Sequence, residues 1–149
     1  MSASVRHTGI VVRDLNSWLQ FLTESLDFKV WIDQVEKGEF ISHLLGIRGS
    51  EVRTIKLRDS KGGTIELLQF KSPKNENPHS SLVEPNSFGI THIAIEVIAI
   101  ETKIEALSRE GYRPIAPARL SEDGKARVCY LRGPEHVLFE LVELLVSDD

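Results

Sequence analysis

Short runs in which apolar and polar residues alternate predict β-strands, and two of these runs resemble each other. They are RHTGIVV at 6–12 and THIAIEV at 91–97, and each carries a histidine just inside the run, His7 or His92. A similar run at matching places in both halves of a chain indicates an internal repeat.

Side chains alternate between the two faces of a strand. In both runs the branched apolar residues therefore share one face, which is suited to packing under a helix. The histidine shares the other face with a very small residue, Gly9 after His7 and Ala94 after His92. The small residue leaves room beside the imidazole ring.

A second pair of runs matches without gaps, LRDSKGGTIELLQF at 57–70 and LRGPEHVLFELVEL at 131–144. Each places one glutamate, Glu66 or Glu140, inside an otherwise apolar strand. An ionised carboxylate among such neighbours requires a compensating positive charge, since burying it alone is costly.

The spacing of the two matched pairs locates an insertion in the first copy. His7 and His92 stand further apart in the chain than Glu66 and Glu140 do. The first copy must therefore contain extra residues between its histidine and its glutamate. This predicts a longer internal loop there, which we assign to 36–50.

Each histidine run is followed by a helical pattern. In the first copy Asp14 can cap the amino end, and the apolar stripe consists of Leu15, Trp18, Leu19, Leu22 and Leu26. In the second copy Gly111 can end the helix, and the stripe consists of Ile100, Ile104 and Leu107.

Each copy therefore reads as strand, helix and three strands, which predicts an α+β protein built from two βαβββ modules. The expected organisation is one domain over 1–149, with module one at about 1–70 and module two at about 88–145. The segment between them, at about 71–87, is polar and contains prolines, so it is predicted to be a linker.

Composition excludes several classes of partner and location. The 149 residues are 41% hydrophobic and 27% charged, with a formal net charge of −4 and mixed signs along the chain. Binding to nucleic acid or to an anionic membrane requires a clustered basic surface. This pattern of charges does not indicate one, so neither is expected as a partner. No apolar run is long enough to span a membrane, and the start shows no signal peptide. With its single cysteine, Cys129, the chain is expected to be cytoplasmic.

Four repeat-related residues are the candidate metal ligands: His7, Glu66, His92 and Glu140. Two imidazoles and two carboxylates at matched positions form the mixed nitrogen and oxygen set that a borderline or hard cation requires. The remaining histidines have no repeat partner and are expected at the surface: His43 in the long loop, His79 in the linker and His136 in a hairpin turn.

Lys56 and Tyr130 are related by the same offset as the two glutamates, and with Arg58 and Arg132 they are predicted to face the open side of the sheets. Lys56 or Tyr130 would then contact polar groups of a substrate. The alternative, which the behaviour of long polar side chains favours, is that all four extend to solvent at the rim.

Paired βαβββ modules, each with a histidine in the first strand and a glutamate in the last, resemble the vicinal oxygen chelate superfamily. It includes glyoxalase I, methylmalonyl-CoA epimerase, extradiol dioxygenases, fosfomycin-modifying enzymes and bleomycin-binding proteins. The resemblance covers essentially the whole chain and implies a curved, open-barrel cup around one divalent metal ion. The residues His7, Glu66, His92 and Glu140 match the His (or Gln), Glu, His, Glu set of glyoxalase I.

The resemblance implies a metal-dependent lyase, isomerase or epimerase acting on a small molecule. Glu140 would remove and return a proton next to a metal-bound carbonyl, with Glu66 on the opposite side and Ni²⁺, Co²⁺, Zn²⁺, Mn²⁺ or Fe²⁺ as the ion. Relatives of this size imply a homodimer. Two residues depart from the family pattern: Asp27 stands where the family usually has a glycine and must adopt the turn itself, and Ala99 stands where many relatives have an aspartate cap.

Two alternatives remain open. One is an Fe(II) extradiol-type dioxygenase with His7, His92 and Glu140 as its triad and Tyr130 beside it, which leaves Glu66 without a role. The other is a non-catalytic binding or resistance protein, in which the metal is structural or absent.

Overall fold

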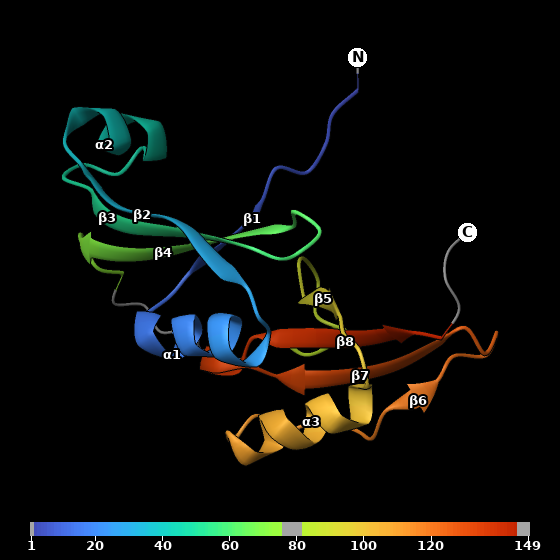
Figure 1. The fold of residues 1–149 in the computed structure, drawn as a ribbon. Helices are drawn as coiled ribbons and strands as arrows, with labels where there is room; N and C mark the ends of the chain where they lie inside the picture. The colour runs from blue at the N-terminus through green and yellow to red at the C-terminus, as the bar shows by residue number, and fades with distance from the viewer. Residues whose placement is uncertain (1, 76–81, 146–149) are drawn as a thin grey trace. The chain divides into compact units, whose positions relative to one another are not determined.

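The structure is a computed structural model that describes residues 2–75 and 82–145. The chain divides into two compact units, Met1–Ser80 and Ser81–Asp149, and each is described by itself (Figure 1). Within the described ranges, no helix has the length and apolar character needed to cross a membrane.

The first unit contains one four-stranded sheet in the order β1-β4-β3-β2. Its strands are β1 (Thr8–Val11), β2 (Lys29–Lys37), β3 (Glu51–Arg58) and β4 (Thr64–Ser72). The helical segments are α1 (Leu15–Gln20), the π-helix η1 (Phe21–Ser25) and α2 (Glu39–Leu45). Strand β1 pairs in parallel with β4, while the pairs β4–β3 and β3–β2 are antiparallel.

The core of the first unit joins the first helix to one face of the sheet. Asp14 caps α1 by accepting a hydrogen bond from the Ser17 backbone N–H at 3.1 Å, as the sequence predicts. Fully or almost fully buried side chains come from α1, η1, β3 and β4: Leu15, Trp18, Phe21, Leu22, Ile55, Leu57, Ile65 and Leu67. Each such side chain stabilises the fold by roughly 1.5–3 kcal/mol relative to its exposed state.

The second unit repeats this arrangement with the order β5-β8-β7-β6. Its strands are β5 (His92–Glu96), β6 (Arg119–Leu120), β7 (Ala126–Arg132) and β8 (Leu138–Leu144). The helices are α3 (Ile100–Arg109) and the short 3-10 turn η2 (Pro134–His136). Strand β5 pairs in parallel with β8, and the other pairs are antiparallel. Buried side chains again come from the helix and the central strands: Ile100, Leu107, Cys129, Leu131, Phe139 and Leu141.

The α+β class and the two βαβββ modules are thus confirmed, and the two sheets are open. Strand faces also follow the predicted alternation in β1, where Val12 is buried just after the strand while Val11 is 67% exposed. That these modules form a single domain around a shared cup stays a prediction.

Three local features refine the sequence-based picture. The range 36–50 is not a plain loop, because α2 occupies its centre and carries His43. Strand β4 continues to Ser72 and so enters the range 71–87 predicted as linker. His79 lies outside the described residues.

Both residues that depart from the family pattern have a positive φ, which was expected of Asp27. Asp27 adopts a positive φ of 60° after η1, a conformation usually left to glycine. Ala99 has a φ of 53° at the start of α3, and its backbone N–H donates to the Glu143 carboxylate at 2.8 Å. The Glu143 carboxylate from β8 thus holds the backbone of the N-cap residue, while Ala99 itself provides no side-chain cap for α3.

Candidate functional site

In the first unit the repeat-related histidine and glutamate are in direct contact. His7 Nε2 lies 3.6 Å from Glu66 Oε1, and their side chains are 33% and 14% exposed. The parallel pairing of β1 with β4 places Gly9 opposite Glu66. His7 lies two positions before Gly9, where an added Cβ would meet the Leu68 side chain at an ordinary contact distance of 3.5 Å.

Lys56 neutralises the same carboxylate. The antiparallel register of β3 and β4 sets Lys56 opposite Glu66, and Lys56 Nζ lies 3.3 Å from Glu66 Oε2. This ion pair provides the positive charge that a half-buried carboxylate requires. Lys56 does not simply extend to solvent, since its side chain is only 25% exposed.

The second unit holds the equivalent pair. His92 Nε2 lies 3.1 Å from Glu140 Oε2, with side chains 32% and 22% exposed. Ala94 takes the place of Gly9, because it is the partner of Glu140 in the parallel register of β5 and β8. The Thr91 hydroxyl contacts His92 Nδ1 at 2.8 Å. A hydrogen bond to one ring nitrogen fixes the orientation of an imidazole and the role of its other nitrogen.

Tyr130 takes the place of Lys56 in this unit. It faces Glu140 across the β7–β8 register, and its hydroxyl donates to Glu140 Oε2 at 3.4 Å. The hydroxyl also lies 3.4 Å from His92 Nε2, and the two rings meet edge to face at 5.1 Å. Burial raises the pKa of Tyr130, and the Glu140 charge adds to this effect. The hydroxyl therefore stays protonated at neutral pH and serves as a hydrogen-bond donor.

The structure thus brings the four predicted ligands together as two pairs, one in each unit. No group of three or more histidine, cysteine, aspartate or glutamate side chains suited to a metal ion occurs in 2–75 and 82–145. The donors present do fit a divalent ion, because each pair offers one imidazole nitrogen and carboxylate oxygens that remain partly accessible. The sharing of one ion by both pairs remains a prediction.

The arginines beside these pairs have separate roles. The Arg58 guanidinium carbon lies 3.2 Å from the centre of the Trp31 ring, a cation–π contact. Arg132 binds the segment before β5, since its guanidinium donates to Val83 O at 3.0 Å and Glu84 Oε2 at 3.1 Å. These contacts engage both guanidinium groups with partners other than the repeat-related glutamates.

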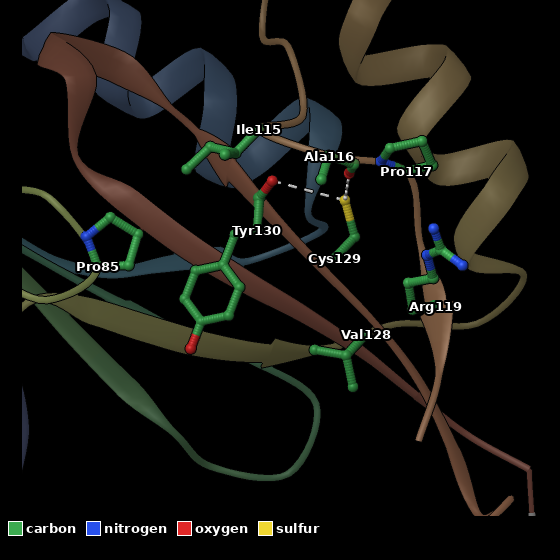
Figure 2. Close-up of a pocket in the computed structure, with 8 residues that line it drawn as sticks. All are labelled: Pro85, Ile115, Ala116, Pro117, Arg119, Val128, Cys129 and Tyr130. Atoms are coloured by element: carbon green, nitrogen blue, oxygen red, sulfur yellow. Dashed lines mark hydrogen bonds between the residues drawn. The ribbon is translucent and has the colours of Figure 1, made fainter. Parts of the chain in front are cut away.

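The second unit also contains a pocket of about 240 Å³ beside Tyr130 (Figure 2). Its lining is apolar apart from Tyr130, Cys129 and Arg119, and it comes from β7, from the segment 115–117 and from Pro85. The sequence analysis missed this pocket and the contact of Thr91 with His92. The prolines at 114 and 117 could have indicated the pocket, since they mark a stiff segment between α3 and β6 that can form a fixed wall.

The sequence was compared with models of known protein families. A family model described as the glyoxalase, bleomycin resistance protein and dioxygenase superfamily matches residues 6–130. The chain belongs to this superfamily. The match spans most of both modules, and it includes His7, Glu66 and His92. No match was found among curated proteins.

Solved structures share this fold over nearly the whole chain. A glyoxalase family protein from Bacillus cereus has a TM-score of 0.88 at 24% identity, covering 98% of this chain and 97% of that one. A Frankia domain named as glyoxylase, bleomycin resistance protein or dioxygenase has a TM-score of 0.67 at 17% identity, with coverage of 97% and 93%. The fosfomycin resistance protein FosX of Listeria monocytogenes has a TM-score of 0.60 at 19% identity, with coverage of 96% and 94%. A mutant of FosX was solved with Mn(II) and a dihydroxypropylphosphonic acid.

Proposed function

We propose that this member of the superfamily is a divalent-metal-dependent enzyme of the glyoxalase I type. It removes a proton from the carbon next to a carbonyl group of a small substrate, as a lyase, isomerase or epimerase does. The observation that carries the proposal is the His–Glu contact at the same repeat position in both units, 3.6 Å in the first and 3.1 Å in the second.

The ion would be held by His7, Glu66, His92 and Glu140. Both pairs keep partly exposed side chains, so donor atoms remain open to a cation and to substrate. When bound, a divalent ion supplies Lewis acid stabilisation of a carbonyl oxygen that gains negative charge, worth several kcal/mol. A Mn(II) complex is known for the structural neighbour FosX, which supports a metal in this fold.

Glu140 is the proposed base, and its surroundings support this role. The neutral Tyr130 hydroxyl donates to one carboxylate oxygen of Glu140 and orients the group without neutralising its charge. Glu66, by contrast, is paired with the Lys56 ammonium group. Within residues 2–75 and 82–145 no ammonium group pairs with Glu140, so Lys56 competes with substrate at Glu66 and not at Glu140, and Glu66 acts as the second carboxylate.

One observation favours an Fe(II) dioxygenase as the second candidate. The Tyr130 hydroxyl lies 3.4 Å from both His92 Nε2 and Glu140 Oε2, so it stands beside two members of the His7, His92 and Glu140 triad. In that case Glu66 would be held by Lys56 rather than by the metal.

The test begins with metal analysis of purified protein, which should carry about one divalent ion per pair of modules. We expect His92→Ala and Glu66→Gln each to weaken metal binding, since either change removes a direct bond. An undiminished affinity in His92→Ala would refute the ligand assignment. Oxygen uptake with a catechol, combined with full metal affinity in Glu66→Gln, would select the dioxygenase.

The base is tested by solvent deuterium exchange into ketones and thioesters. Glu140→Gln should retain some metal and lose at least about a hundredfold in exchange rate, the usual contribution of a positioned base. Unimpaired exchange in metal-loaded Glu140→Gln would transfer the role to Glu66. A folded, metal-free protein without exchange would favour a non-catalytic binder.

A further inference from the structure

The pocket beside Tyr130 is bounded by β7 on one side and by the segment 115–117 on the other (Figure 2). Val128 and Tyr130 project from the same face of β7, two positions apart, while Cys129 points the other way toward the Ala116 carbonyl. The β7 side of the pocket therefore consists of three consecutive residues, with Val128 and Tyr130 on one face of the strand and Cys129 on the other.

The opposite wall is held to β7 by backbone hydrogen bonds. Ile115 N–H donates to the Tyr130 carbonyl at 2.8 Å, and Arg132 N–H donates to the Arg113 carbonyl at 3.4 Å. Pro114 forms a bridge with Leu131 between these two bonds. Because proline restricts the backbone, this wall is preformed and does not have to be ordered by a ligand.

Pro85 is fixed as well. It lies in a turn in which the Ser87 N–H donates to the Glu84 carbonyl and the Ser87 hydroxyl accepts from the Glu84 N–H, both at 2.9 Å. Arg132 ties this turn to β7 through Val83 and Glu84. A preformed apolar pocket binds a ligand with a small ordering cost.

Tyr130 connects the pocket to the His92–Glu140 pair. Its ring lines the pocket, while its hydroxyl lies 3.4 Å from Glu140 Oε2. A molecule whose apolar part rests against this ring would therefore present its other end toward Glu140. The lining carries one formally charged side chain, Arg119.

We propose that this pocket binds the non-reacting part of the substrate, an aryl or branched aliphatic group attached to the carbonyl-bearing end. The volume of about 240 Å³ exceeds the roughly 150 Å³ of an apolar cavity that accepts benzene. The assignment rests on the proposed function, because it takes Glu140 as the reacting end. It narrows the substrate class to ketones, keto acids or thioesters that carry such an apolar group.

The binding test compares benzylacetone with acetone in metal-free protein, by backbone amide shifts in NMR titrations. These two ketones differ only in the benzyl group. We expect benzylacetone to bind at least about tenfold more tightly, as burial of one aromatic ring implies, with shifts at 115–117 and 128–130. Equal weak binding of both ketones, or shifts confined to other residues, would overturn the proposal.

Single substitutions test whether benzylacetone binds in this pocket. Val128→Phe should fill the pocket and weaken benzylacetone binding about tenfold or more. Ile115→Asn should also weaken benzylacetone binding, and it should leave the fold intact because the Ile115 side chain is 49% exposed. Ile98→Phe adds a ring at a position that is 90% exposed in the same unit and should bind as the parent does. Parental affinity in both pocket variants would refute the assignment.

The reaction is measured separately, as deuterium exchange of the same ketones by metal-loaded protein. Exchange of acetone and benzylacetone with equal efficiency in the parent and in Val128→Phe would leave the proposed function intact and overturn the pocket assignment. Benzylacetone binding in the pocket without exchange of either ketone would overturn the proposed function, and with it the assignment of the pocket as part of a substrate site.

Discussion

At the scale of single residues, the two units differ most in the group beside the glutamate. Lys56 places a positive charge 3.3 Å from Glu66, whereas Tyr130 places a neutral hydroxyl 3.4 Å from Glu140. The position opposite the glutamate is therefore repeated in both units, but its side chain is charged in the first unit and neutral in the second. Two carboxylates that are equivalent by sequence repeat become chemically different.

This difference leads to a prediction for Lys56. Its ammonium group competes with any divalent ion for Glu66, so Lys56→Met should raise metal affinity by roughly two- to fivefold, the range expected for a partly exposed ion pair. Isothermal titration with Mn²⁺ or Zn²⁺ measures it. Lys56→Arg, which keeps the charge, is the matched control and should bind close to the parent. Unchanged affinity in Lys56→Met would contradict the competition.

Cys129 carries a second prediction at this scale. Its side chain is buried, and burial, assisted by the Glu101 charge, raises the pKa of the thiol. A higher pKa means less thiolate at a given pH, and thiolate is the reactive form. The native protein should react slowly with an aromatic disulfide reagent at mildly alkaline pH, and the unfolded protein quickly. Equal rates in both states would show that the thiol is accessible.

The sequence predicted which residues face the open side but not their contacts. The offset shared with the two glutamates marked Lys56 and Tyr130 as equivalent, and strand alternation placed them on the face of the glutamates. Their contact with Glu66 and Glu140 depends on the exact register across each hairpin. That register is set by turn geometry, which a periodic pattern does not encode.

At the scale of secondary-structure elements, prediction succeeded where one face of a segment is buried and failed where neither face dominates. The stripes over α1 and α3 gave both helices, because Trp18 and Leu107 recur with their neighbours at helical spacing. Helix α2 was missed since EFISHLL is short and no face of it is buried as a whole: Ile41 is buried, but Phe40 is 76% and Leu44 66% exposed. The π-helical turn at η1 was missed because it changes hydrogen bonding and not residue type.

The pairing of β2 with β3 supports a prediction about pH. Arg53 donates two hydrogen bonds to Asp33, at 3.0 and 2.7 Å, and these bonds lower the pKa of Asp33. A lowered pKa in the folded state means that the stabilising contribution is present above the ordinary aspartate pKa and is lost as the pH falls through the folded-state pKa.

Carboxyl-carbon NMR titration of Asp33 checks this expectation. The parent protein should titrate below the ordinary aspartate range, and Arg53→Met should return Asp33 to it. Lys29→Met, at a strand-end residue whose ion pair is with Asp27, is the control and should leave Asp33 unchanged. An ordinary pKa for Asp33 in the parent would contradict the paired geometry in solution.

At the scale of the whole molecule, we predict a homodimer with two equivalent metal sites. The sheets are open, and within the described ranges their outer strands, β1 and β2 in one sheet and β5 and β6 in the other, each pair with one strand of their own sheet. Unpaired strand edges are commonly protected in an assembly, and a two-fold partner would cover them. Sedimentation equilibrium at micromolar concentration measures the mass. A single 16.8 kDa species that retains its metal would contradict both the dimer and any site shared between chains.

The parallel pairing of β1 with β4 and of β5 with β8 has a consequence for how the protein folds. The first and last strands of each module lie side by side, so each histidine meets its glutamate only after the whole intervening chain is in place. Contacts between residues so distant in sequence form slowly, because the loop must close before they contribute. During synthesis, each histidine–glutamate pair therefore assembles only when its module is complete. An insertion such as α2 falls within the closed loop and lengthens it at a small entropic cost, so a module can gain new surface without moving its histidine and glutamate.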